Sequence, residues 1–474
     1  MEYLGQNLKA LFVDLHCSGL WHDEKVISDS ILLAPADDIL RAYEAEKQRG
    51  TVDLRRFYDR YFVPVGAPDS GYRTNPAHGP KDHIAALWSQ LAKPADNPSE
   101  RSTRFPLPQP YVVVGGRFQE AYYWDSYFTQ LGLLKSGRFG LVRHMLDNFA
   151  HAIATVGHIP NGFRSYFLTR SQPPFFAQMV QDYGRAVGDL AGVYAAYLPA
   201  MVAEYRYFMM TEHNFNGLGR YWDAANSPRI EMYGTDLAWS DHAKTHPDFY
   251  RDLRAACESG WDFSSRWLTD PMDLGTIRTT QIWAVDLNCL LLRYEEILAE
   301  ASPDAADYRT AADVRRRAIS ERFFDAERGY FFDVLATDGS LIPVTTAAGM
   351  FPLYAGAATQ EQAVRAAAWV EAHLLKPGGL LTTDVDCGQQ WDCPNGWAPL
   401  QWIAVQGLRR YGFHDLADVL RKRWLATCDT VFYTTGKFVE KYNVLDPSAA
   451  SGGGEYALQD GFGWSNGVYL DLAD

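Results

Sequence analysis

Residues 115–128 read GGRFQEAYYWDSYF, and this stretch is the starting point for interpreting the rest of the chain. Glycine, arginine, carboxylate and aromatic residues are combined here in a way that neither a plain core helix nor a plain surface helix requires. Aromatic rings stack on the apolar faces of a pyranose, and carboxylate and guanidinium groups hold its hydroxyls. The stretch alone is equally compatible with a sugar pocket and with an amphipathic helix whose aromatics are core, so other segments must decide.

Helical periodicity dominates on the C-terminal side of this stretch. An apolar stripe from Phe139 to Ile153 predicts a helix that stops before Gly157. Further helices are expected at 83–91, at 175–210 with a kink or break at Pro199, and at 287–301, 304–323, 360–375, 398–411 and 415–428.

Strand signals are few, and neither a βαβ rhythm nor a fixed-period repeat is present. We therefore expect an all-α fold, with residues 81–474 as a single domain. Residues 1–80 contain short apolar patches and then the Pro- and Gly-rich segment PVGAPDSGYRTNPAHGP, which predicts an irregular N-terminal wrap packed on that domain.

Composition excludes several classes of partner. The chain has 474 residues, 47% of them hydrophobic, and 44 Lys+Arg against 58 Asp+Glu give a net charge of −14. This charge argues against nucleic acid and anionic membranes and favours a neutral or cationic small molecule. The six cysteines form no disulfide framework and no zinc motif, so no metal or other cofactor is expected. Free thiols and the lack of a leader-like N-terminus predict the cytoplasm, with a periplasmic or secreted location as the alternative if a leader was trimmed. We also expect a monomer.

Later stretches again place aromatic residues beside arginine or carboxylate residues at the ends of predicted helices. Buried charges need partners, so a recurring combination of this kind is hard to explain by packing alone. These stretches are GHIPNGFRSYFLTRSQPP (157–174), SPRIEMYGTD (227–236), ESGWDFSSRW (258–267), CGQQWDCPNGWAP (387–399), KFVEKYNV (437–444) and SGGGEYALQDGFGWSNG (451–467).

Two of these motifs carry a family resemblance. GGRFQEAYYWDSYF and QQWDCPNGWAP resemble the two signature motifs of the trehalases of glycoside hydrolase family 37, and the other stretches match in order from about Leu11 almost to the C-terminus. Val114 stands where the first signature normally has proline. The segment RIEMY (229–233) lacks the family's proline and serine but keeps Arg229 and Glu231.

The resemblance implies an (α/α)6 barrel whose long loops form a pocket at one end, and hydrolysis of α,α-trehalose to two glucoses with inversion. Carried over by position, Asp262 matches the general acid and Glu440 the general base. Residues that match sugar contacts are Arg117, Phe118, Tyr122, Trp124, Asp125, Asn161, Arg170, Gln172, Arg229, Glu231, Trp391 and Glu455.

The chemistry agrees with these roles. Inversion needs a proton donor and a water-activating carboxylate about 6.5–9.5 Å apart. An apolar setting beside Trp261 would keep Asp262 protonated, and arginines near Glu440 would keep it ionised. The residues alone leave Glu455 as a rival base, and the motif match favours Glu440. Two other functions stay open, a related α-glucosidase with another α-glucoside as substrate and a non-catalytic sugar-binding protein.

Overall fold

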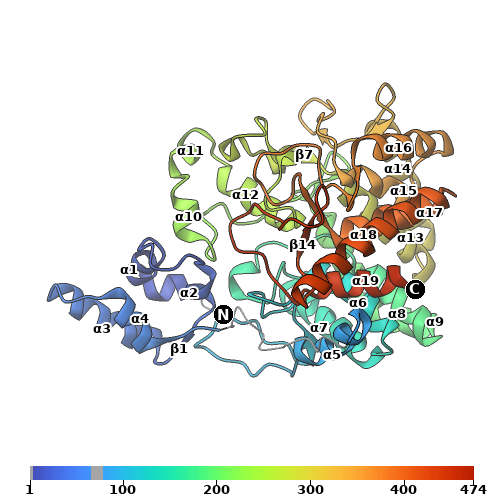
Figure 1. Ribbon diagram of the computed structural model, residues 1–474. Coiled ribbons are helices and arrows are strands. Elements are labelled where there is room, and N and C mark those ends of the chain that lie inside the picture. Colours follow the sequence, from blue (N-terminus) through green and yellow to red (C-terminus); the bar gives the residue numbers. More distant parts are fainter. Residues whose placement is uncertain (1–3, 66–77) are drawn as a thin grey trace.

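The computed structural model describes residues 4–65 and 78–474, and most of the chain is helical (Figure 1). Within residues 78–474, twelve helices alternate along the chain between an inner and an outer position. The inner helices are α6 (Tyr123–Lys135), α8 (Phe176–Val187), α13 (Val285–Ala301), α15 (Phe351–Ala355), α17 (Ala398–Arg410) and α19 (Gly463–Ala473). The outer helices are α5 (Pro80–Leu91), α7 (Phe139–Val156), α9 (Leu190–Phe208), α14 (Ala305–Arg322), α16 (Gln360–His373) and α18 (His414–Thr435).

The inner helices close into a ring. Helix α6 packs on α8, α8 on α13, α13 on α15, α15 on α17, α17 on α19, and α19 returns to α6. Outer helices cover the joints, with α7 against α6 and α8, α9 against α8 and α13, and α18 against α17 and α19. The expected all-α (α/α)6 barrel is thereby confirmed.

Burial explains which helices lie inside. In α6 every residue from Tyr123 to Leu133 is buried, whereas α7 buries a single stripe that includes Val142, Leu146 and Phe149. A helix surrounded by protein can be apolar on all faces, and a covering helix needs only one apolar face. The buried residues on every face of 123–128 therefore follow from the inner position of α6, whereas 115–122 form the loop that leads into it.

Connection lengths decide where a pocket can form. Each inner helix is followed by a short turn into its outer partner, as at 136–138 and 188–189. The connections back to the next inner helix are long, as at 157–175 and 436–462. Since consecutive helices run antiparallel across short turns, the long loops all gather at the N-terminal ends of the inner helices. This is the predicted arrangement of loops.

Local signals at helix ends are only partly confirmed. The capping box of Thr359 and Gln362 starts α16, and Gly157 ends α7 in the left-handed conformation with φ 95°. A break at Pro199 is not seen, because Pro199 lies within α9, and the alternative of a kink there stays a prediction. Within 175–210 the helix is interrupted at Gly188. Gly188 ends α8 in the left-handed conformation with φ 72°, as Gly157 ends α7.

The strands are short and form only two-stranded pairs in the described residues. These pairs are β1 (Ile31–Leu32) with β2 (Phe62–Val63), β3 (Ala92–Lys93) with β4 (Tyr111–Val112), β5 (Asn214–Phe215) with β6 (Leu218–Gly219), β7 (Ile282–Trp283) with β10 (Val334–Leu335), β8 (Phe324–Asp325) with β9 (Tyr330–Phe331), β11 (Leu375–Lys376) with β12 (Gly379–Leu380), and β13 (Asn395–Trp397) with β14 (Lys441–Asn443). Between α9 and α13 the chain also inserts α10 (Tyr233–Leu237), α11 (Ser240–Thr245) and α12 (Phe249–Ser259).

The N-terminal region is more regular than its sequence indicated. It contains α1 (Leu4–His16), α2 (Lys25–Asp29), α3 (Ala36–Gln48) and α4 (Leu54–Tyr61), drawn in blue at one side of Figure 1. The expectation of irregular structure here is wrong for a physical reason. Its short helices bury apolar residues such as Leu11, Ile39 and Phe57 in a small core of their own, which short windows of sequence do not reveal. Residues 66–77 of the predicted loop lie outside the described residues, and the division into domains at residue 80 stays a prediction.

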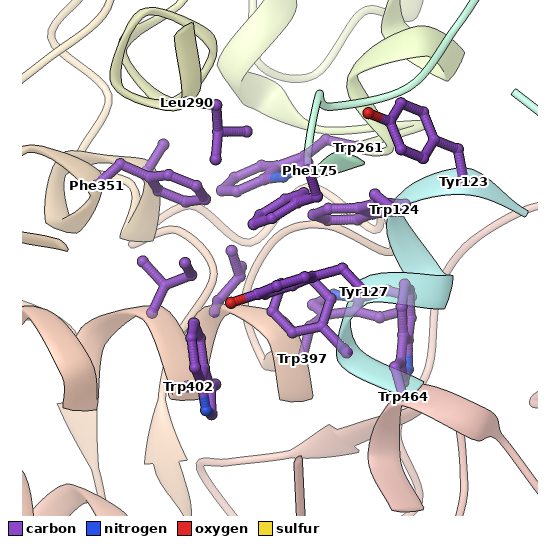
Figure 2. Close-up of a cluster of buried hydrophobic side chains, with 14 of the residues drawn as sticks. Tyr123, Trp124, Tyr127, Phe175, Trp261, Leu290, Phe351, Trp397, Trp402 and Trp464 are labelled. Atoms are coloured by element: carbon purple, nitrogen blue, oxygen red, sulfur yellow. The ribbon is translucent and has the colours of Figure 1, made fainter. Parts of the chain in front are cut away.

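An aromatic layer fills the middle of the barrel (Figure 2). The rings of Tyr127 and Phe175 stack with centroids 4.4 Å apart, and Trp402 meets Tyr127 edge-on at 5.7 Å. This layer separates the two ends of the barrel. Among the helices of the described residues, none has the length and apolar character needed to cross a membrane.

Candidate active site

A cavity opens at the loop end of the barrel, with about 740 Å³ of space that protein atoms do not fill, part of it open to solvent. Its wall contains all fourteen residues selected from the sequence: Arg117, Phe118, Tyr122, Trp124, Asp125, Asn161, Arg170, Gln172, Arg229, Glu231, Asp262, Trp391, Glu440 and Glu455. The structure thus brings together residues more than 300 positions apart in the chain.

Fold topology explains this convergence. Arg117 and Tyr122 lie in the loop that leads into α6, and Arg170 and Gln172 lie in the loop that leads into α8. Glu440 belongs to the loop between α18 and α19. Every outer-to-inner connection ends at the same face of the barrel, so side chains placed just before inner helices point into one space.

Asp262 combines access to the cavity with a largely enclosed carboxyl group. It follows α12, and its backbone carbonyl accepts a hydrogen bond from Gln390 Nε2 at 2.5 Å. Burial raises the pKa of Asp262 to about 7, with Arg229 lowering it and the negative charge of Glu455 raising it. A carboxyl group with this pKa is largely protonated under mildly acidic conditions and is able to donate a proton.

Glu440 differs from Asp262 in its hydrogen bonding. Its Oε1 accepts a hydrogen bond from the hydroxyl of Tyr456 at 2.7 Å, and Lys441 Nζ lies 3.7 Å from Oε2. In the described part of the chain no group donates a hydrogen bond to the buried Oε2. One oxygen is therefore fixed by the protein, and the other is left to accept a proton or a hydrogen bond from a ligand.

Gln390 links the loops that carry these two carboxyl groups. Its side-chain oxygen accepts a hydrogen bond from Lys441 Nζ at 2.8 Å, and its side-chain nitrogen donates to the carbonyl of Asp262. Strand pairing between Trp397 and Lys441 also joins the 387–399 segment to the loop of Glu440. The separation of about 6.5–9.5 Å between the two carboxyl groups stays a prediction.

Each arginine of the cavity is paired with a carboxylate other than Glu440. Arg117 Nη2 bonds to Asp23, and Arg170 Nη2 bonds to Glu231 Oε1 at 2.8 Å. Arg229 holds Glu455 with two hydrogen bonds of 3.1 and 2.9 Å. The cation next to Glu440 is Lys441, so the expected arginine neighbour of Glu440 is not seen in the part of the chain that the structure describes. Nε of Arg117, Nε of Arg170 and Oε2 of Glu231 are buried without a hydrogen-bond partner in the described residues.

Asp125 adds a further carboxyl group to the cavity wall in the first turn of α6. Burial holds the pKa of Asp125 well above its usual range, and the nearby charges of Glu440 and Asp262 raise it further. Asp125 therefore lies in a poorly solvated space beside the carboxyl groups of Asp262 and Glu440, and their charges disfavour its ionisation.

Aromatic rings form the apolar part of the wall. Trp391 is stacked between Trp397, at 3.8 Å between centroids, and Trp261, at 5.4 Å. Phe118 meets Tyr456 edge-on at 5.5 Å, and the Tyr122 hydroxyl is tied to Glu120 at 2.8 Å. Rings held in this way offer fixed apolar faces to a ligand.

The two amide residues also fix the wall. Asn161 Nδ2 donates to the carbonyls of Ser171 and Cys257, and Gln172 Oε1 accepts from the backbone N–H of Trp124 at 3.0 Å. These bonds tie the loops before α6 and α8 to the end of α12. Both residues therefore have a structural role in addition to their place in the cavity wall.

The N-terminal segment reaches this cavity, which sequence reasoning missed. Lys25 lines it and pairs with the buried Glu120 at 2.7 Å. Glu24 accepts hydrogen bonds from the backbone N–H groups of Gly234 and Thr235, at 2.6 and 2.8 Å. We call the residues Asp23, Glu24 and Lys25 the clasp, because they hold the 115–122 and 229–235 loops together. The charged triplet in WHDEK was visible in the sequence but carried no sign of its partners.

Asp392, which the sequence places after Trp391, does not line the cavity. Its buried carboxylate accepts hydrogen bonds from the Ser265 N–H at 2.7 Å, the Ser264 hydroxyl at 3.0 Å and the Thr383 hydroxyl at 2.7 Å. It therefore positions the segment directly after Asp262. In the described residues no group of three or more His, Cys, Asp or Glu side chains is arranged to hold a metal ion.

Comparison with solved structures defines the class of the fold. The neutral trehalase of Saccharomyces cerevisiae superposes with a TM-score of 0.68 at 24% identity, covering 100% of this chain and 94% of the yeast chain. A GH63 mannosylglycerate hydrolase from Thermus thermophilus superposes with a TM-score of 0.61 at 20% identity, covering 84% of this chain and 100% of the other. These likenesses define the class of the fold as an (α/α)6 barrel.

Sequence comparison identifies the family. The family model for trehalase matches residues 20–474, and the periplasmic trehalase of Escherichia coli is 42% identical over 492 aligned positions, which cover 98% of this chain and 86% of the relative. The chain belongs to the trehalase family. The predicted activity of a glycosidase that hydrolyses trehalose is thereby confirmed at this level.

The predicted cytoplasmic location is wrong. The curated relatives are named periplasmic trehalases, which points to the periplasm. Cysteine usage misled the prediction, because Cys257, Cys289 and Cys428 are buried in the fold. Thiols enclosed in a core give little information about the redox state of the compartment.

Proposed function

We propose that the chain is an inverting α,α-trehalase in which Asp262 protonates the glycosidic oxygen and Glu440 activates the attacking water. The observation that carries this proposal is the different state of the two carboxyl groups in one cavity. Asp262 has a raised pKa and receives no hydrogen bond on its carboxyl group from the described side chains. Glu440 is hydrogen-bonded at Oε1, and in the described residues its Oε2 accepts no hydrogen bond.

The acid role of Asp262 rests on protonation. An acid catalyst must hold its proton until the leaving oxygen takes it, and burial disfavours the carboxylate that remains afterwards. Trp391 on the cavity wall and Trp261, which stacks on it, keep water from solvating that charge.

The base role belongs to Glu440 rather than to its rival Glu455. Both oxygens of Glu455 accept hydrogen bonds from Arg229, so this carboxylate is already occupied. Glu440 has only one oxygen engaged, and Oε2 is available to orient a water molecule and take its proton. We assign Glu455 to substrate binding together with Arg229.

The remaining residues would hold the two glucose rings. Unpartnered polar atoms on Arg117, Arg170 and Glu231 supply donors and an acceptor for sugar hydroxyls. Rings such as Phe118 and Trp391 supply apolar surfaces for the sugar C–H faces. A non-reducing disaccharide of two identical rings needs two such sets of anchors, which fits trehalose better than a single sugar.

Anomer analysis tests the stereochemistry. We expect proton NMR of a fresh digest of trehalose, recorded before mutarotation, to show equal amounts of α- and β-glucose. Under inversion only the attacked ring changes configuration and becomes β-glucose. The leaving ring keeps its own C1–O bond and is released as α-glucose. Production of α-glucose alone would indicate retention and would require carboxyl groups about 5–5.5 Å apart. Maltose is the matched control, and a comparable rate on maltose would instead support a broader α-glucosidase.

The clasp provides a second test. Hydrogen bonds from His16, Thr235 and Gly234 outweigh the effect of burial and hold the pKa of Glu24 below its usual range, so its carboxylate stays charged. We expect Glu24→Gln to raise KM for trehalose about tenfold with a smaller change in kcat, because the amide nitrogen would face the N–H groups of Gly234 and Thr235.

The control for this test is Glu46→Gln. Glu46 lies in α3 and pairs with Arg60 at 2.7 Å, away from the cavity wall. The Glu46→Gln variant also removes one negative charge from the N-terminal region, and we expect it to leave KM unchanged. An unchanged KM in Glu24→Gln, or an equal rise in both variants, would show that the clasp does not position the pocket.

A further inference from the structure

The barrel has a second cavity at the end opposite the active site. It contains about 1550 Å³ of space that protein atoms do not fill, part of it open to solvent. All six inner helices contribute to its wall, and none of its lining residues belongs to the first cavity. The connections at this end of the barrel are short turns that do not cover it, so the fold itself leaves an opening here. Its lining must show whether it is a binding site.

The lining is basic in an otherwise acidic protein. Five cations face two carboxyl groups, Asp182 and Asp471, whereas the whole chain has a net charge of −14. The cations are Lys135, Arg185, Arg293, Arg409 and Arg410. Basic residues in the last turn of a helix offset the helix dipole, which accounts for Lys135, Arg185 and the α17 pair. Arg293 lies near the middle of α13, where the helix dipole does not act, and its guanidinium pairs with Glu296.

A buried amide points to a ligand. Gln178 is only 3% exposed, its Oε1 accepts a hydrogen bond from the Tyr354 hydroxyl, and the residue lines this cavity. Its Nε2 is buried and donates to no acceptor within the described residues. An unmade hydrogen bond in a buried position is unfavourable, and an acceptor oxygen on a bound molecule would satisfy it.

The inner surface of the cavity is aromatic. Tyr127, Tyr354 and Trp402 line it, with Trp402 held by a hydrogen bond of 2.7 Å from its Nε1 to Asp471. The cavity therefore offers aromatic rings at its base, an amide donor beside them and arginine side chains around its wall. Arginine is suited to phosphate, because its planar fork donates two parallel hydrogen bonds to a phosphate group.

We propose that this mouth is a second binding site, for a small phosphorylated sugar. The phosphate would pair with arginines of the wall, among them Arg293 and Arg409. A sugar oxygen would accept the hydrogen bond of Gln178 Nε2, and the ring would rest on Trp402 and Tyr354. The aromatic layer that includes Phe175 and Tyr127 separates this site from the catalytic cavity, so both sites can be occupied together.

Isothermal titration with glucose 6-phosphate tests the proposal on the full chain. We expect a dissociation constant of about 1 mM or tighter, with Arg293→Gln and Arg409→Gln each weakening binding about tenfold. Arg328→Gln is the matched control, because Arg328 is exposed and pairs with Asp325 outside the cavity. Gln178→Met should weaken binding without any change of charge. Circular dichroism melts confirm that each variant is folded.

Three results would overturn the proposal. The first is no measurable heat, and the second is an equal loss in Arg328→Gln, which would indicate unspecific attraction. The third is displacement of glucose 6-phosphate by saturating trehalose in the Asp262→Asn variant, which would place binding in the catalytic cavity. Inorganic phosphate is titrated in parallel, and equal affinity for it would refute the sugar part of the proposal.

Discussion

Glu440→Gln is expected to lower kcat on trehalose by about a thousandfold or more, with little change in KM. The amide cannot take a proton from water, and general base catalysis of this kind contributes roughly 10²–10⁴-fold to a rate. Overall shape is retained, because the substituted side chain can still accept the hydrogen bond from the Tyr456 hydroxyl at the position of Oε1. Steady-state kinetics with purified variant measures both constants.

Glu455→Gln is the comparison that gives this result its meaning. Glu455 lines the same cavity, but its oxygens are bound to Arg229. We expect this variant to raise KM and to keep kcat within about tenfold of wild type, since it loses a binding contact and no proton acceptor. If Glu455→Gln instead loses kcat as severely as we expect of Glu440→Gln, and Glu440→Gln does not, the two assignments must be exchanged.

Asp262→Asn is expected to lower kcat on trehalose by about a thousandfold, because the asparagine has no proton to give to the leaving oxygen. The decisive measurement uses α-glucosyl fluoride, whose fluoride leaves without full protonation. Activity of Asp262→Asn on this substrate should approach that of wild type, whereas Glu440→Gln should remain impaired because water must still be activated. Equal losses on both substrates would refute the acid role of Asp262.

The pH profile of the wild-type enzyme supports the same assignment. Burial raises the pKa of Asp262 to about 7, so its acid form dominates below that pH and is lost above it. The kcat/KM should therefore fall as pH rises through about 7. Glu455 raises this pKa by its negative charge, so Glu455→Gln should move the alkaline limb to lower pH. An alkaline limb that stays in place in this variant would contradict the assignment.

Several parts of the fold and site could be predicted from sequence because they are local. The apolar stripe of α7 and the capping box at Thr359 depend on residues three or four positions apart. Short segments of sequence also reveal the residue types of a sugar site. Arginine, tryptophan and carboxylate residues close together in the chain indicate that their charges bind each other or a ligand. Prediction failed for a break at Pro199 and for the N-terminal helices, where packing against distant residues overrode local preference.

The sequence by itself determined that this chain forms an all-helical barrel, and it selected the residues that line its cavity. Tertiary structure alone decided how those residues differ from one another. Arg229 and Glu455 are 226 positions apart, and their hydrogen bonds show that Glu455 is occupied. In the described residues, Oε2 of Glu440 accepts no hydrogen bond. The physical reason is that pKa and hydrogen bonding depend on distances between loops, and folding sets those distances only when the ring of inner helices closes.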